Sequence, residues 1–137
     1  MSLTAIFVIM SIFIAGCSNS SDKEEQYINV QKRIGNEYED FNDITNKDEV
    51  QKVKDILHKS EWEHRKVDMA RPADYRFIFQ YKNPGIAAKA IVYELWIIPN
   101  KDQVELVRGD SEYIQLDKKR SAELVEIITG NKISDLN

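Results

Sequence analysis

The residue with the clearest chemical role is Cys17, the only cysteine among the 137 residues. It follows Ile14-Ala15-Gly16, and an uncharged, largely apolar stretch over residues 3–15 leads up to it. An apolar segment followed by small residues and a cysteine is the pattern that bacterial lipoprotein signal peptidase requires. The thiol is alkylated by a diacylglyceryl group, and cleavage then occurs just before the cysteine. The sequence therefore predicts a lipid anchor on Cys17.

This pattern divides the chain into three parts. Residues 1–16 are expected to be the signal peptide, residues 17–26 the lipidated cysteine with a flexible tether, and residues 27–137 a single domain. Residues 1–4 carry no Lys or Arg, which departs from the usual charged start. An uncleaved anchor helix with an incidental cysteine stays open as an alternative, although a spanning helix needs roughly 20 apolar residues. Both alternatives place the domain on the extracytoplasmic face of the cell membrane.

The residue types that catalyse reactions or bind metals do not form a recognisable pattern. His58 and His64 have two glutamates near them, but the HExxH spacing that fixes two imidazoles on one helix face is missing. Residues 109–111 are Gly-Asp-Ser, yet no histidine follows them to act as a base. We therefore predict no metal, no cofactor and no catalytic residue. The alternative is a small envelope hydrolase that uses a carboxylate pair drawn from the 23 Asp and Glu residues.

Aromatic side chains offer two candidate surfaces for recognition. Tyr38 and Phe41 lie in the acidic stretch 37–43, which is expected to be a loop or an irregular edge and leaves both rings without a core role. We predict that this pair forms an interaction surface for an envelope protein or a small ligand. A second set occupies alternate positions of one expected strand, and it either packs against a helix or lines a cleft for an apolar ligand: Tyr75, Phe77, Phe79 and Tyr81.

Hydrophobic periodicity predicts the elements that position these side chains. Alternation predicts five strands, over residues 28–34, 75–81, 90–98, 104–107 and 113–116. Helical spacing predicts one amphipathic helix that begins at Thr45 or Asn46 and ends near Ser60, and a second between Asp117 and Gly130. The order β-α-β-β-β-β-α predicts an α+β fold, in which an antiparallel sheet of about five strands carries two helices mainly on one face.

Charge and composition narrow the range of partners. The net charge is −4, and the sequence has no basic stripe, which argues against binding to nucleic acid. If Cys17 carries lipid, the domain contains no disulfide and depends on burial and hydrogen bonds for its stability. The sequence therefore predicts a membrane-anchored lipoprotein that acts as a noncatalytic binding or interaction module.

Four strand and turn segments of the expected domain form a recognisable set, namely Trp62, Val67-Asp68-Met69-Ala70, Pro72-Ala73-Asp74-Tyr75 and Tyr93-Glu94-Leu95-Trp96-Ile97. In these segments the chain resembles the small YhfM-type lipoproteins of Bacillus-like bacteria, and the resemblance covers most of the exported part. The resemblance implies a membrane-anchored α+β domain and brings no catalytic residue with it.

Overall fold

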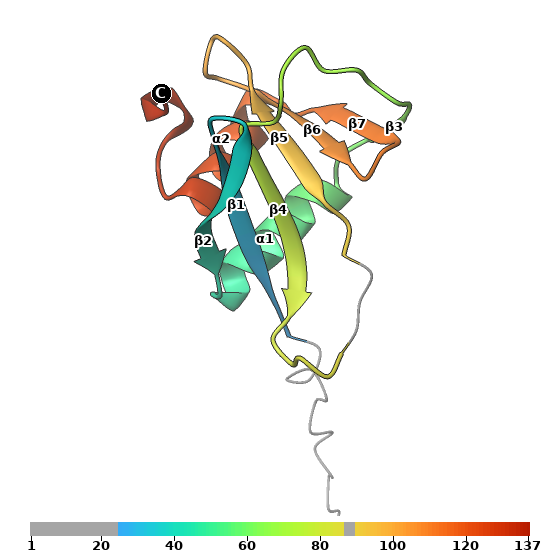
Figure 1. Cartoon of the computed structure of the whole chain (residues 1–137), viewed down its shortest axis with the longest axis vertical. Coiled ribbons are helices and arrows are strands. Elements are labelled where there is room, and N and C mark those ends of the chain that lie inside the picture. Colours follow the sequence, from blue (N-terminus) through green and yellow to red (C-terminus); the bar gives the residue numbers. More distant parts are fainter. Residues whose placement is uncertain (1–24, 87–89) are drawn as a thin grey trace, which may run out of the picture.

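Seven strands and two α-helices are present in residues 25–86 and 90–137, the part of the chain that the computed structural model describes (Figure 1). The strands are β1 (Gln26–Ile34), β2 (Glu37–Ile44), β3 (Glu63–His64), β4 (Tyr75–Tyr81), β5 (Tyr93–Ile97), β6 (Val104–Arg108) and β7 (Glu112–Gln115). The helices are α1 (Lys47–His58) and α2 (Lys118–Thr129), and a short 3-10 helix covers Ile133–Asp135. The strands form one sheet in the order β2-β1-β4-β5-β6-β7-β3, and every neighbouring pair is antiparallel.

The α+β class and the antiparallel sheet are confirmed, but the sheet has seven strands in the described residues rather than about five. Residues 37–43, expected as a loop or an irregular edge, belong to the regular edge strand β2, because residues 37–44 pair with residues 28–34 of β1 through a hairpin at Gly35, which has φ of 64°. The two-residue strand β3 forms the other edge of the sheet. In addition, β5 begins at Tyr93 rather than at residue 90, and Ile91 and Val92 before it are 51% and 41% exposed.

Both helices begin and end close to where the capping residues predict. The side chain of Asn46 accepts hydrogen bonds from the backbone N–H groups of Asp48 and Glu49 at the start of α1. Asp117 caps α2 in the same way, through Arg120 N at 2.8 Å. Gly130 ends α2 in the left-handed conformation, with φ of 76°, which glycine adopts without steric cost. No helix in the described residues is long and apolar enough to cross a bilayer.

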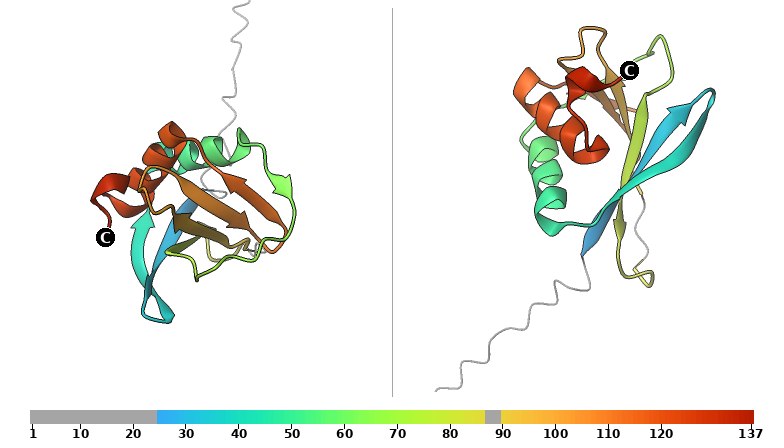
Figure 2. Two further views of the ribbon diagram at one scale, coloured as in Figure 1. Left: turned by 90° about the horizontal axis from the view of Figure 1, so that it is seen from above. Right: turned by 90° about the vertical axis from the view of Figure 1, so that its left-hand side faces the viewer.

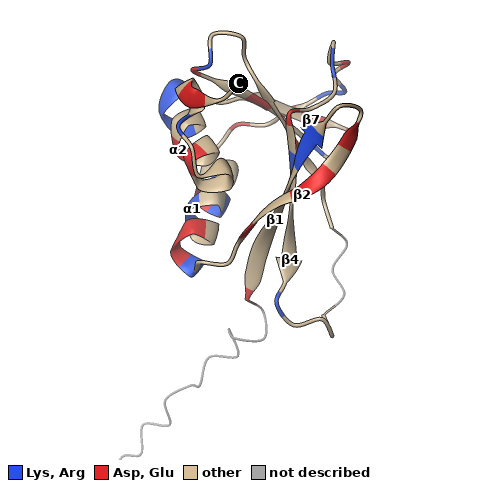
Figure 3. Cartoon of the chain, turned by 60° about the vertical axis from the view of Figure 1, so that its left-hand side comes forward, with Lys and Arg blue, Asp and Glu red and all other residues tan. Residues whose placement is uncertain are grey.

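The two helices cover the same face of the sheet (Figure 2). The apolar stripe of each helix meets the apolar positions of the central strands, so one core forms between the two layers. The following residues in this core are at most 1% exposed: Ile28, Val30, Val53, Leu57, Phe77, Leu95, Leu106, Leu124, Val125 and Ile128. Figure 3 shows that charges of both signs remain on the helices, whereas acidic residues are prominent on β2.

The opposite face of the sheet is partly covered by the chain itself. Residues 65–74, here called the crossing segment, connect the edge strand β3 to β4 and must therefore pass over β5, β6 and β7. Trp96 points to this side, since its strand neighbours face the helices; it is 6% exposed and donates Nε1–H to the carbonyl of Arg71 at 2.8 Å. The crossing segment thereby gives β5 cover on both faces.

Candidate functional site

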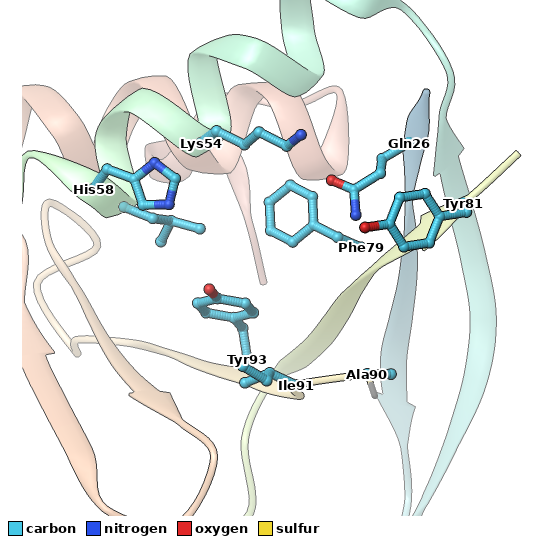
Figure 4. Close-up of a pocket in the computed structure, with 9 residues that line it drawn as sticks. Gln26, Lys54, His58, Phe79, Tyr81, Ala90, Ile91 and Tyr93 are labelled. Atoms are coloured by element: carbon cyan, nitrogen blue, oxygen red, sulfur yellow. The ribbon is translucent and has the colours of Figure 1, made fainter. Parts of the chain in front are cut away.

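A cavity of about 250 Å³ lies at the end of the molecule where β1 begins and β4 ends (Figure 4). We call it the aromatic pocket, because three of its nine lining side chains are Phe or Tyr. Its wall comes from α1, from the first residue of β1, from the second half of β4 and from the segment that leads into β5. The lining residues are Gln26, Lys54, Leu57, His58, Phe79, Tyr81, Ala90, Ile91 and Tyr93.

The apolar floor of the aromatic pocket is held in place by stacked rings. Phe77, buried in the core, lies parallel to Tyr93 with ring centroids 5.0 Å apart. Phe79 meets Tyr93 edge to face at 5.8 Å, and Trp62 meets Tyr93 in the same way at 6.2 Å. Such contacts restrict the orientation of each ring beyond what burial alone would do. The floor is therefore preformed.

The polar groups of the aromatic pocket come from opposite walls. The ammonium group of Lys54 lies 5.8 Å from the centre of the Phe79 ring, which is a cation–π contact. Lys54 forms no ion pair with a carboxylate of the described residues. Figure 4 shows the hydroxyl of Tyr81 beside the amide of Gln26 and His58 above the Tyr93 ring. This arrangement combines one cation and several hydrogen-bonding groups with an apolar floor.

Glu25 fixes the chain beside this pocket. Its carboxylate lies 3.3 Å from Lys47 at the start of α1 and 3.3 Å from Lys82 just after β4. Burial raises the pKa of Glu25, but the hydrogen bonds from Lys47 and Lys82 outweigh it, and the net pKa is lowered. The carboxylate therefore stays ionised and joins the first described residue to two walls of the domain.

The predicted site residues lie in different places. Cys17 is outside the described residues, so its lipidation stays a prediction. Tyr38 and Phe41 lie on β2 and face opposite sides of the sheet, because Tyr38 contacts Arg76 and Phe41 contacts Tyr75, which are adjacent on β4. The pairing of β1 with β2 shifts between Val30 and Gln31 and leaves Phe41 as the extra residue of a bulge.

Both rings already have contacts within the domain. The hydroxyl of Tyr38 donates to the carbonyl of Ala73 at 2.8 Å, and the guanidinium of Arg76 lies 3.7 Å from the centre of its ring. Phe41 is 40% exposed and packs edge to face on Tyr75 at 5.7 Å. The two residues do not form one continuous patch, and an interaction through either of them stays a prediction.

The residues considered for catalysis and metal binding are also separated. His58 lines the aromatic pocket from α1, whereas His64 lies on β3, 3.7 Å from Glu112. In residues 25–86 and 90–137, no three His, Cys, Asp or Glu side chains are grouped so that they could hold a metal ion. Gly109-Asp110-Ser111 forms the turn between β6 and β7, with Gly109 at φ of 60°, as its residue types favour.

The sequence pointed to one wall of the aromatic pocket and missed the other. Phe79 and Tyr81 were singled out by their alternation along β4. Gln26 and Lys54 were not, since only the packing of α1 against the sheet brings them there. One signal was available: Lys54 and His58 are four residues apart, so they lie on the same face of α1.

Comparison with known proteins identifies a family without adding a chemical activity. The model of a family described as "YhfM protein" matches residues 19–134, which is most of the chain and includes every strand and both α-helices. No curated protein and no solved structure matches. The match confirms the resemblance seen in Trp62 and in the strand and turn segments that follow it. The chain belongs to the YhfM family.

Proposed function

We propose that this protein is an extracytoplasmic lipoprotein, anchored to the cell membrane through Cys17, and that it acts as a noncatalytic binding module. Its aromatic pocket takes a small amphiphilic molecule, with an apolar part on Phe79 and a polar or anionic part near Lys54. The observation that carries the proposal is the position of Gln26, which lines the pocket and lies nine residues after Cys17.

The short stretch of chain between Cys17 and Gln26 limits how far the aromatic pocket can lie from the membrane. Nine extended residues span at most about 30 Å, so a lipid on Cys17 would keep the aromatic pocket close to the headgroups. The contacts of Glu25 with Lys47 and Lys82 hold the first described residue at this same end of the domain. A molecule that leaves or enters the membrane would meet this pocket first.

The carboxylates with shifted pKa values support binding rather than acid catalysis. The hydrogen bond from Arg108 lowers the pKa of Glu112, and the pKa of Glu25 is lowered as well. A general acid requires the opposite shift, toward neutral pH. A hydrolase with a carboxylate pair is therefore not the function that we propose.

The anchor is tested by Cys17→Ser in a bacterial host that processes lipoproteins. We expect the wild-type chain to incorporate labelled palmitate and to sediment with membranes. The variant should lose the label, because a serine hydroxyl does not replace the thiol in the alkylation step. Ser21→Ala is the matched control and should keep both properties. Full labelling of Cys17→Ser would contradict the anchor.

The pocket is tested with the dye anilinonaphthalene sulfonate, whose rings and sulfonate match the floor and the cation. Binding to the full chain in detergent should enhance its fluorescence, and Lys54→Gln should weaken that binding by roughly tenfold through loss of a charged contact. Lys52→Gln removes an exposed lysine of the same helix that does not line the pocket, and it should have no effect. Equal effects of the two variants would contradict a specific role for the pocket.

A further inference from the structure

A second cavity, of about 350 Å³, lies at the opposite end of the domain from Glu25. The end of β1, the crossing segment, the turn after β5 and the C-terminal residues surround it, and Figure 1 shows these segments together near the C-terminus. Four of its lining side chains are cationic and only one is acidic. We call it the basic pocket, after Lys32, Arg33, Arg71 and Lys101.

The single acidic side chain, Asp74, is fully used within the wall of the basic pocket. Arg71 donates to both of its carboxylate oxygens, one of them from Nη2 at 3.0 Å. The backbone N–H of Ile97 donates to Asp74 Oδ2 at 2.7 Å. Arg71 also donates to the carbonyl of Ile97 at 2.8 Å, so its guanidinium is fixed to β5. Asp74 therefore balances Arg71 and pairs with none of the other three cations, of which Lys32 has only a cation–π contact with Phe41 at 5.6 Å.

Those three cations, Lys32, Arg33 and Lys101, form no ion pair with a carboxylate in the described part of the chain. Arg33 donates from Nη1 to the carbonyl of Gly35 at 3.1 Å, but its Nε is buried and has no hydrogen-bond partner among the described residues. A buried donor without an acceptor is costly and rare in folded proteins. The Arg33 guanidinium, which lines the basic pocket, therefore has donor capacity that the described residues do not use.

The turn that carries Lys101 is held in an unfavourable backbone conformation. Lys101 has φ of 54°, and it is the only residue other than glycine with positive φ in residues 25–86 and 90–137. Its backbone N–H donates to the carbonyl of Ile98 at 2.7 Å, which closes the turn. A side chain other than glycine, asparagine or aspartate rarely adopts this region, and such strain is concentrated at functional sites.

The hydroxyl of Tyr75 adds a neutral hydrogen-bond donor to the wall of the basic pocket. Tyr75 is 3% exposed, lines the basic pocket, and donates its hydroxyl hydrogen to no other described residue. Burial, and then the charge of Asp74, raise the pKa of this hydroxyl, so it keeps its proton at physiological pH. Tyr75 can therefore donate a hydrogen bond to an anion beside the cationic side chains.

We propose that the basic pocket binds the phosphate group of a small organic phosphate ester. Guanidinium and ammonium groups from three separate segments match the several oxygens of a tetrahedral dianion better than the two of a carboxylate. The cavity is also larger than a free phosphate ion needs. The organic part of a phosphate ester would lie against Ile97 and Pro99. This proposal does not depend on the lipid anchor or on the aromatic pocket.

The test is calorimetric titration of the full chain in detergent with glycerol 3-phosphate, inorganic phosphate and glycerol. We expect glycerol 3-phosphate to bind most tightly and glycerol not to bind, with an affinity that falls as salt is added. Arg33→Gln and Lys32→Gln should each weaken binding by roughly tenfold or more. Lys119→Gln removes an exposed lysine of α2 outside this pocket and should leave the affinity unchanged.

Lys101→Gly separates binding from folding. Glycine accepts the positive φ, so this variant should melt no lower than the wild type while it loses affinity for glycerol 3-phosphate by roughly tenfold. Unchanged affinity in Lys101→Gly, or no binding of glycerol 3-phosphate to the wild type, would overturn the proposal. Equal binding of inorganic phosphate would overturn the assignment of an ester.

Discussion

The two ends of this domain carry cavities of similar size and opposite chemistry. The aromatic pocket measures about 250 Å³ and is built from rings around one lysine, whereas the basic pocket measures about 350 Å³ and gathers four cations around one carboxylate. Both are lined by β4, with Phe79 and Tyr81 at one end and Tyr75 at the other. A single strand can therefore line two different pockets, because the helix-facing residues near each of its ends contact a different cavity.

Removal of the Phe77 ring, which lies between the two pockets on β4, should have the largest effect on stability. Phe77 is 1% exposed and stacks on Tyr93, so Phe77→Ala should lower the free energy of unfolding by about 3–5 kcal/mol. Urea unfolding measures this loss, and Ile34→Ala at a position that is 54% exposed should change it by less than about 0.5 kcal/mol. Phe77→Ala should weaken dye binding at the aromatic pocket more than glycerol 3-phosphate binding at the basic pocket, since Tyr93 forms part of the aromatic floor. Equal losses of the two ligands would contradict the independence of the two pockets.

A smaller effect should be confined to the basic pocket. Asp74→Asn removes the charge that balances Arg71 and weakens the contact with Ile97 N, which should cost about 1–2 kcal/mol of unfolding free energy. This cost in unfolding free energy is small because Arg71 is half-exposed, so solvent screens its attraction to Asp74. Nuclear magnetic resonance should show shifted amide signals around the basic pocket and unchanged ones around Phe79. Changes spread over both ends would show that the pockets are coupled.

The smallest effect should come from a tyrosine that belongs to neither pocket. Burial, and then the hydrogen bond from the Tyr113 hydroxyl to Glu105 at 2.6 Å, raise the pKa of Tyr113 from 10.0 to about 12. Because the folded pKa lies above the unfolded one, this group stabilises the fold below pH 10, and the contribution is lost as the pH rises toward 12. Tyr113→Phe should cost about 0.5–1 kcal/mol at neutral pH.

Ultraviolet titration of tyrosinate checks this assignment. The wild type should show a tyrosine that ionises near pH 12 and that is missing from Tyr113→Phe. The variant should leave both pockets unaltered, as judged by dye and glycerol 3-phosphate binding. Tyr75, whose pKa is also raised, remains in the variant, so the test is the signal near pH 12: its persistence at full amplitude would assign the shift to another tyrosine.

The parts of the fold that the sequence predicted are those with a local cause. Asn46, Asp117 and Gly130 mark the helix ends because each forms its capping contact within a few residues. The strand β2 was missed because half of its eight residues are acidic, and Asp, Asn and Glu have low β-propensity; it exists through its pairing with β1. The basic pocket could not be predicted at all, since its four cations come from three stretches of chain that meet only in the folded domain.

The two edges of the sheet have a consequence for molecules held at high density on a surface. An unpaired strand edge is a template on which a second copy can add its own strand, and confinement to two dimensions would favour such growth. Here one edge carries Glu37, Glu39, Asp40 and Asp43, and the other is only two residues long. Mutual repulsion at the first edge and the lack of length at the second oppose sheet-to-sheet association. Neighbouring copies can therefore crowd together without joining their sheets edge to edge.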